Sequence, residues 1–151
     1  MGADAGRLEV QISALGDWDI AKDPLASACR FTLEAEGCVE GEVSITLLDD
    51  DRIAELNSEY FGKTAPTDVI AFPLFGEGET LLGDVYLGFE QASRQASDLG
   101  VPLHEELLRL TIHGTLHVLG HTHPEGPDRA EGPMFRRQEE LLSQFLSSRP
   151  G

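Results

Sequence analysis

Residues 113–123 read His-Gly-Thr-Leu-His-Val-Leu-Gly-His-Thr-His and hold four of the chain's five histidines. His113 and His117 stand four residues apart, so on a helix both imidazole rings project from one face. Gly120 allows the left-handed backbone that ends a helix, and the turn brings a third ring, His123, within reach. Three neutral nitrogen ligands with a fourth position open to water are typical of a catalytic zinc site.

The other two histidines are expected to lie outside this set. His121 lies beside the turn and points elsewhere if His123 is the ligand, and His104 precedes His113 by more than two helical turns and is expected at the surface. A single histidine on an apolar helix is usually a satisfied core residue, but three at these spacings suit both helix geometry and tetrahedral coordination. Zinc is the first choice of metal, and the ligand type leaves nickel, copper and iron open.

The spacing HxxxHxxGxxH also occurs in the metzincin proteases, whose general base is a glutamate directly after the first histidine. Here that position is Gly114, which has no group that takes a proton. We therefore expect no protease mechanism of that type. The predicted catalytic group is the zinc-bound water itself, because zinc lowers the pKa of a bound water toward about 7.

Length and composition favour a single catalytic domain over residues 1–151, with 1–7 and 148–151 loosely ordered. The chain has no apolar run long enough to span a membrane and no signal peptide, so we expect a cytoplasmic protein in which Cys29 and Cys38 are reduced thiols. The net charge is −16, from 11 basic and 27 acidic residues, which works against non-specific attraction to phosphate backbones.

Hydrophobic periodicity predicts an α+β fold with a mixed four-stranded sheet packed with helices. The expected elements are strand 8–13, a helix from Asp23-Pro24 to Gly37, strand 39–47, a helix carrying Ile53, Leu56 and Tyr60 and ended by Gly62, strand 68–74, strand 82–89, helix 90–99, a helix opened by Pro102 that carries the histidines, and a last helix at about 134–146. The first two strands should be parallel and the last two antiparallel. The histidine helix should bury the face formed by Leu108, Ile112, Leu116 and Leu119.

Two groups of acidic residues are assigned structural roles. Asp49, Asp50 and Asp51 precede an apolar periodic run, so we interpret them as a helix cap and first-turn charges rather than as metal ligands. Asp68 stands at a strand start beside Thr67, and we expect it to hydrogen-bond the loop backbone rather than bind metal.

Four blocks of sequence together resemble one known family. They are His113-Gly114, Leu116-His117, Gly120 and His123; Leu56-Asn57 and Tyr60 with Pro66-Thr67-Asp68-Val69-Ile70-Ala71-Phe72-Pro73; Gly83-Asp84-Val85; and Met134 with Glu139-Glu140-Leu141-Leu142. The family is that of the YbeY-type endoribonucleases, or rRNA maturation factors. The resemblance covers most of the chain from the second strand onward, and it departs at His121 and Thr122, where tyrosine and aspartate are usual.

The resemblance implies a zincin-like arrangement of helices and sheet, one zinc ion on His113, His117 and His123, and cleavage of single-stranded RNA. It also implies roles in rRNA maturation and ribosome quality control, with rRNA and the small ribosomal subunit as partners and no membrane. Family members commonly carry an arginine after the tyrosine of the second block, and here that position is Phe61. Either Lys63 contacts the phosphate instead or cleavage is weakened; Phe61 itself stacks on a base or packs the loop.

The leading hypothesis is therefore a zinc-dependent, single-strand-specific endoribonuclease. One alternative is a non-catalytic ribosome-assembly factor whose zinc only holds the fold, which the acidic surface and Phe61 would suit. Another is a different metal-dependent hydrolase such as a peptidase, which rests on the histidine spacing alone.

Overall fold

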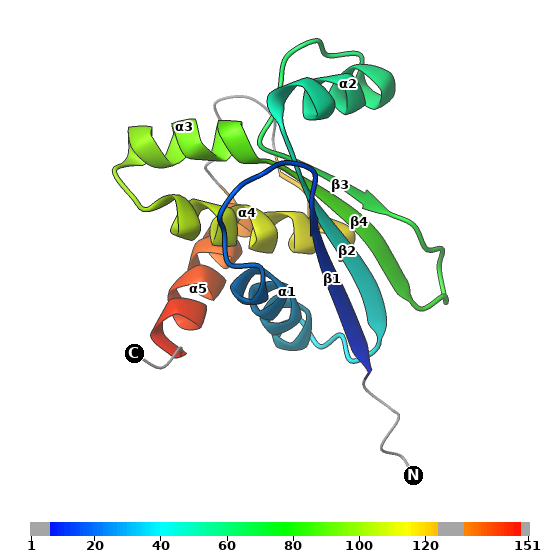
Figure 1. Ribbon diagram of the computed structural model, residues 1–151. Coiled ribbons are helices and arrows are strands. Elements are labelled where there is room, and N and C mark those ends of the chain that lie inside the picture. The colour runs from blue at the N-terminus through cyan, green and yellow to red at the C-terminus, as the bar shows by residue number, and fades with distance from the viewer. Residues whose placement is uncertain (1–6, 124–131, 149–151) are drawn as a thin grey trace.

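A mixed four-stranded sheet packed with helices forms the fold in the computed structural model, which describes residues 7–123 and 132–148 (Figure 1). The elements of these residues are β1 (Leu8–Ala14), α1 (Asp23–Ala35), β2 (Gly41–Leu48), α2 (Asp50–Phe61), β3 (Val69–Pro73), β4 (Leu81–Gly88), α3 (Phe89–Leu99), α4 (Leu103–Val118) and α5 (Pro133–Ser148). The predicted α+β class and the mixed sheet are confirmed, and each predicted element is present.

The strand order is β1-β2-β4-β3. Strand β2 runs parallel to β1 and to β4, whereas β3 is antiparallel to β4, so both predicted pairings are confirmed. Strand β3 therefore lies at one edge of the sheet, with Ile70 opposite Tyr86 and Phe72 opposite Asp84. The predicted start of the second strand was wrong by two residues, since Val39 precedes β2 and is 61% exposed.

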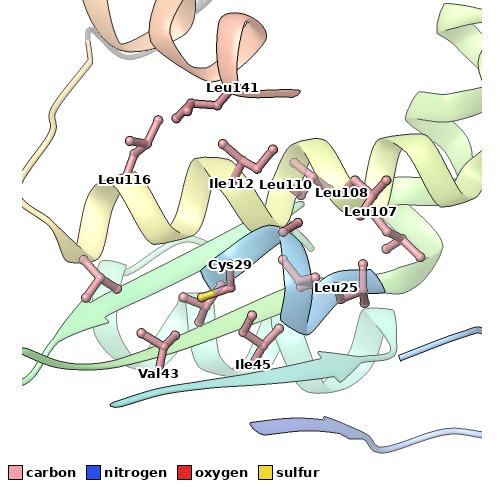
Figure 2. Close-up of a cluster of buried hydrophobic side chains, with 14 of the residues drawn as sticks. Leu25, Cys29, Val43, Ile45, Leu107, Leu108, Leu110, Ile112, Leu116 and Leu141 are labelled. Atoms are coloured by element: carbon pink, nitrogen blue, oxygen red, sulfur yellow. The ribbon is translucent and has the colours of Figure 1, made fainter. Parts of the chain in front are cut away.

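Helix α4 is the centre of the molecule. It lies against β3 and β4 and also contacts α1, α3 and α5. Figure 2 shows Ile112 and Leu116 on the side of α4 that faces Leu141 of α5. The predicted single buried face was too narrow, because α4 is buried almost all round from Glu106 to Thr115 and Leu119 is only partly buried. A helix enclosed by a sheet and three helices has no solvent face to mark its orientation in the sequence.

Two glycines let α4 approach β4 closely. A β-carbon at Gly114 would stand 2.6 Å from Cγ1 of Val85, and one at Gly83 would stand 2.5 Å from Cγ1 of Val118. Both distances are below van der Waals contact, so a side chain at either position would push helix and strand apart. Gly114 therefore has a packing role, and it sets the depth at which the histidines of α4 lie beside the sheet.

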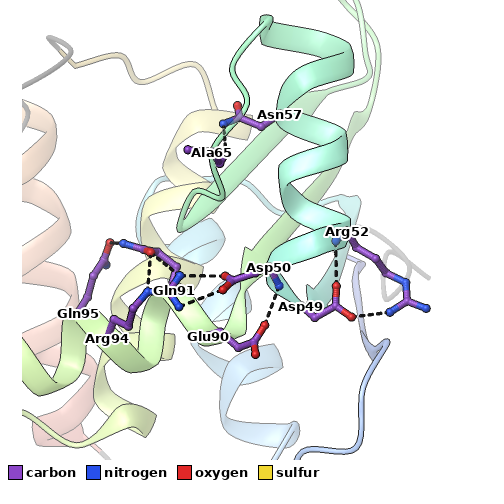
Figure 3. Close-up of polar contacts among 9 residues, drawn as sticks. All are labelled: Asp49, Asp50, Arg52, Asn57, Ala65, Glu90, Gln91, Arg94 and Gln95. Atoms are coloured by element: carbon purple, nitrogen blue, oxygen red, sulfur yellow. Dashed lines mark hydrogen bonds and ion pairs between the residues drawn. The ribbon is translucent and has the colours of Figure 1, made fainter.

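Helix α2 is anchored by its first turn, as Figure 3 shows. The Asp49 carboxylate accepts a hydrogen bond from the Arg52 backbone N–H at 2.8 Å, which confirms the predicted cap. Arg94 of α3 donates to both carboxylate oxygens of Asp50 at 2.9 and 3.0 Å, and Glu90 accepts from the Asp50 N–H at 2.7 Å. By contrast, the predicted cap of α1 at Asp23 was wrong: the cap is the preceding lysine, without a side-chain hydrogen bond.

The predicted loosely ordered ends, 1–7 and 148–151, lie outside the described residues except for Arg7 and Ser148, and the turn predicted from Pro124 lies outside them up to residue 131. Within the ranges 7–123 and 132–148, no helix has the length and apolar character needed to cross a bilayer.

Candidate metal centre

Three histidine rings meet at the end of α4. The ring centroids of His113 and His117 are 4.7 Å apart, those of His113 and His123 are 5.0 Å apart, and those of His117 and His123 are 4.8 Å apart. One nitrogen from each ring lies within 4.8 Å of the others, and among the described residues this is the one group of three or more histidine, cysteine or acidic side chains placed to hold an ion. The three rings are therefore close enough to bind a single metal ion.

The turn that brings in His123 follows from Gly120. Helix α4 ends at Val118, and Gly120 has a φ of 104°, which favours glycine. The N–H of His121 donates to the carbonyl of Leu116 at 2.9 Å, so the terminal carbonyls of the helix are used as the chain reverses. The predicted helix end and the predicted return of the third histidine thus have one local cause.

Hydrogen bonds set the tautomers of two of the rings. Nδ1 of His113 lies 2.6 Å from Oε1 of Gln138, and Nδ1 of His117 lies 3.0 Å from the carbonyl oxygen of His121. Both partners only accept hydrogen bonds, so each Nδ1 carries the proton and each Nε2 keeps a lone pair. A neutral ring with its proton on Nδ1 is a form in which imidazole binds a metal through Nε2.

A chain of polar contacts holds Gln138 in place. Its amide nitrogen donates to Glu139 at 2.9 Å, and the guanidinium of Arg109 bonds both Glu139, at 2.9 Å, and Glu106, at 2.6 Å. Burial alone would lower the pKa of Arg109, but its hydrogen bonds to the two carboxylates outweigh burial. The pKa is therefore raised above its ordinary value, and the guanidinium stays charged. Glu106 is almost fully buried, and it also accepts a hydrogen bond from Gln95 at 2.8 Å.

Gln138 contacts a histidine of the candidate metal centre, and sequence reasoning missed it. It is 5% exposed and lies on the buried face of α5 that carries Met134, Leu141, Leu142 and Phe145. A polar residue inside an apolar helical stripe needs a buried partner, and that pattern is the signal that would have found it. Its partner, His113, is 25 residues away in the sequence.

His121 and His104 lie where they were predicted. His104 is exposed, and Nε2 of His121 points to Oε1 of Glu36 at 2.7 Å, away from the three grouped rings. Arg137 of α5 donates to the other oxygen of Glu36, also at 2.7 Å. Burial raises the pKa of Glu36, but the bonds from Arg137 and His121 outweigh it and hold this pKa below its ordinary value. These contacts tie the segment after α4 to α1 and α5.

A pocket of about 420 Å³ opens over the three histidines. Its lining comes from α2 and the loop after it (Asn57, Phe61, Lys63, Thr67), from residues 69–71 of β3, and from Thr122 beside the histidines. None of these described lining residues is acidic, in a chain of net charge −16. The predicted phosphate contact, Lys63, and the unexpected aromatic, Phe61, therefore both face the histidine site.

Asp68 lies beside this pocket and is 6% exposed. Its Oδ1 accepts a hydrogen bond from the Thr67 hydroxyl at 3.4 Å, and its carbonyl oxygen accepts one from the N–H of Gly88. It is not part of the group placed to hold an ion. Its predicted side-chain bond to the loop backbone stays a prediction.

Comparison with known proteins places this arrangement in one family. The family model described as "Endoribonuclease YbeY" matches residues 13–146, which include α2, β3, α4 and the polar contacts of α5. The chain belongs to the YbeY family. Its relatives include proteins named endoribonuclease YbeY from Persephonella marina, 39% identical over 88% of this chain and 89% of the relative, and from Desulfitobacterium hafniense, 42% identical over 80% of each.

A solved structure supports the same fold. The solution structure of TM1509 from Thermotoga maritima superposes with a TM-score of 0.65 at 26% identity, covering 91% of this chain and 89% of that protein. The family recognised from the histidine and Pro-Thr-Asp blocks is thus confirmed.

Proposed function

We propose that this protein is a zinc-dependent, single-strand-specific endoribonuclease acting in rRNA maturation and ribosome quality control. The observation that carries the proposal is the group of three histidines lining a pocket whose described lining residues include no carboxylate, in a member of a family whose relatives are named endoribonucleases. Its action in the cytoplasm, on rRNA and the small ribosomal subunit, rests on the family resemblance.

Zinc fits the donor set. His113 and His117 each have Nδ1 bonded to an acceptor, which leaves Nε2 for the ion, and His123 offers a third nitrogen within reach. Three imidazoles form an open rather than a closed zinc site. When bound, zinc supplies a Lewis acid that lowers the pKa of its water ligand and polarises a phosphoryl oxygen.

The remaining tasks fall to side chains around the pocket. In the proposal, Gln138 and the His121 carbonyl hold the two helical imidazoles in the metal-binding tautomer. Lys63, an exposed cation of the lining, contacts a phosphate of the substrate, since no arginine is present at the position of Phe61. The absence of carboxylates from the described lining avoids repulsion of the RNA backbone.

The test is a cleavage assay with single-stranded rRNA fragments and zinc-loaded protein. We expect His117→Ala to lose cleavage and metal, and His104→Ala, which changes an exposed histidine on the same helix, to keep both. Equal cleavage by the wild type and His117→Ala would discard the assignment of the site.

A non-catalytic ribosome-assembly factor is the second candidate, favoured by the acidic charge and by Phe61 in place of arginine. In that case chelation lowers the melting temperature while the zinc-restored protein binds RNA without turnover. A peptidase is disfavoured on structural grounds as well, because a β-carbon at Gly114 would overlap Val85, so a glutamate base does not fit there. Absence of cleavage in a peptide-library digest at full zinc occupancy would remove that candidate.

A further inference from the structure

Two exposed aromatic rings end α2, and one of them lines the histidine pocket. Tyr60 and Phe61, the last residues of α2, are 57% and 52% exposed. They are the exposed aromatic side chains of the described residues, and Phe61 also lines the pocket. Single exposed apolar side chains are common on protein surfaces, but apolar side chains that gather in one exposed patch often mark a binding site. Their place beside the histidine site suggests a ligand shared with that site.

Both rings pack against a third aromatic ring, that of Phe72. Phe72 of β3 lies under both: its ring is parallel to that of Phe61, with centroids 6.1 Å apart and planes inclined by 10°, and it meets Tyr60 edge to face at 5.1 Å. Tyr86 of β4 also meets Phe72 edge to face, with ring centroids 6.0 Å apart. One face of Phe61 is thereby supported, while about half of its surface remains open to water.

The backbone around Phe61 is also held in place. Gly62 ends α2 in the left-handed conformation, with a φ of 68°, and the Asn57 side chain donates to the carbonyl of Ala65 at 2.9 Å, which pins the following loop (Figure 3). At the other end, the pair between Arg94 and Asp50 anchors the helix to α3. The open ring is thus presented in one orientation rather than on a flexible loop.

The charge of the lining distinguishes the histidine pocket from three other hollows formed by the described residues. The described hollow on the far side of α2 is lined by Asp51, Glu55 and Glu59, and those near β1 include Glu9 and Glu42. The histidine pocket instead has Lys63 and no carboxylate among its described lining residues. Among these described hollows, the histidine pocket is therefore the one whose described lining favours a polyanion.

We infer that Phe61, supported by Phe72 and flanked by Tyr60, is a stacking site for an unpaired nucleobase of single-stranded RNA whose backbone runs toward Lys63 and the histidines. The inference rests on the proposed function and adds a substrate-binding residue to it. Every base offers a π face, so the site selects for unpaired bases and not for a sequence. A base held in a duplex has both faces covered, so this stacking site would favour single-stranded over double-stranded RNA.

The test measures binding without relying on turnover. Zinc-loaded wild-type and variant proteins are titrated into a fluorescent single-stranded 2′-O-methyl oligonucleotide, which is checked on a gel to remain intact, and into a matched abasic oligonucleotide. Phe61→Ala should raise Kd for the base-containing strand by about 5-fold to about 140-fold, the range for loss of one base–aromatic stack, and should leave Kd for the abasic strand unchanged. Phe61→Trp should retain the wild-type Kd.

Leu99→Ala is the control, because it shortens another exposed apolar side chain, 60% exposed, at the distant end of α3. It should bind both strands as the wild type does. A wild-type Kd for Phe61→Ala, or an equal loss on the abasic strand, would overturn the stacking site even if zinc-dependent cleavage is observed. The reverse result, a base-dependent loss in a protein that cleaves nothing, would support the stacking site and remove the enzyme proposal.

Discussion

Replacing Gln138 by leucine should weaken metal binding without touching a metal ligand. The wild-type amide oxygen of Gln138 lies 2.6 Å from Nδ1 of His113, and His113 is only 5% exposed. Leucine fills nearly the same volume but accepts no hydrogen bond, so the tautomer that leaves Nε2 for the ion would carry a buried, unsatisfied N–H.

The size of the effect follows from that buried group. A buried donor without an acceptor costs about 1–3 kcal/mol, which corresponds to a loss of metal affinity of about 5-fold to about 140-fold. Loss of a partner that orients a metal-binding histidine typically costs about 10- to 100-fold in affinity, so the two estimates agree. We therefore expect Gln138→Leu to raise the zinc Kd by about 10- to 100-fold.

The assay is competition between the protein and a chromophoric zinc chelator. Gln144→Leu is the matched control, because it makes the same chemical change at an exposed position of the same helix. Melting temperatures in excess chelator show whether each variant folds equally well without metal. Histidine ¹⁵N NMR of the metal-free proteins should show that the Nδ1–H tautomer of His113 is lost in Gln138→Leu.

Two further outcomes bear on the reasoning. Gln138→Glu keeps an acceptor oxygen and should recover part of the affinity that the leucine variant loses, although it places a second carboxylate beside Glu139. If Gln138→Leu folds and binds zinc with the wild-type Kd, the contact between α5 and His113 does not orient the ring, and the reasoning is refuted.

Three other features give separate predictions. Burial raises the pKa of Glu36, but its hydrogen bonds outweigh burial and hold that pKa below its ordinary value of 4.5. The ionised carboxylate therefore stabilises the fold above pH 4.5, and this contribution is lost as the pH falls through the folded-state pKa. The difference in melting temperature between the wild type and Glu36→Gln should close in acid, and a constant difference down to about pH 3 would contradict this. Burial raises the pKa of the Cys29 thiol to about 11. With Ellman's reagent the partly exposed Cys38 should therefore react first, and Cys29 should react only as fast as the protein opens. Equal reaction rates for the two thiols would contradict this prediction. A β-carbon at Gly88 would lie 2.2 Å from the Thr67 carbonyl oxygen. Gly88→Ala should therefore lower the free energy of unfolding, measured by urea titration, by about 1–3 kcal/mol. An unchanged urea midpoint would contradict this and show that the backbone at Thr67 moves aside without cost.

The sequence by itself determined the features that depend on local spacing. A four-residue separation places His113 and His117 on one helical face whatever surrounds the helix, and a glycine after them allows the turn that returns His123. Alternation of apolar residues likewise identified the strands, and the acidic run before Ile53 identified a helix cap. These follow from backbone geometry within a few residues, so they were predictable without knowing the packing.

Only the tertiary structure decided which distant residues serve the site. Gln138 meets His113 across 25 residues, and Glu36 meets His121 across 85, because the packing of α5 and α1 around α4 brings them there. The same packing gives Gly114 its role, since its lack of a side chain matters only where Val85 lies opposite. No periodicity encodes such contacts: the partner of a buried polar group is set by how whole elements pack, and that is a property of the folded chain.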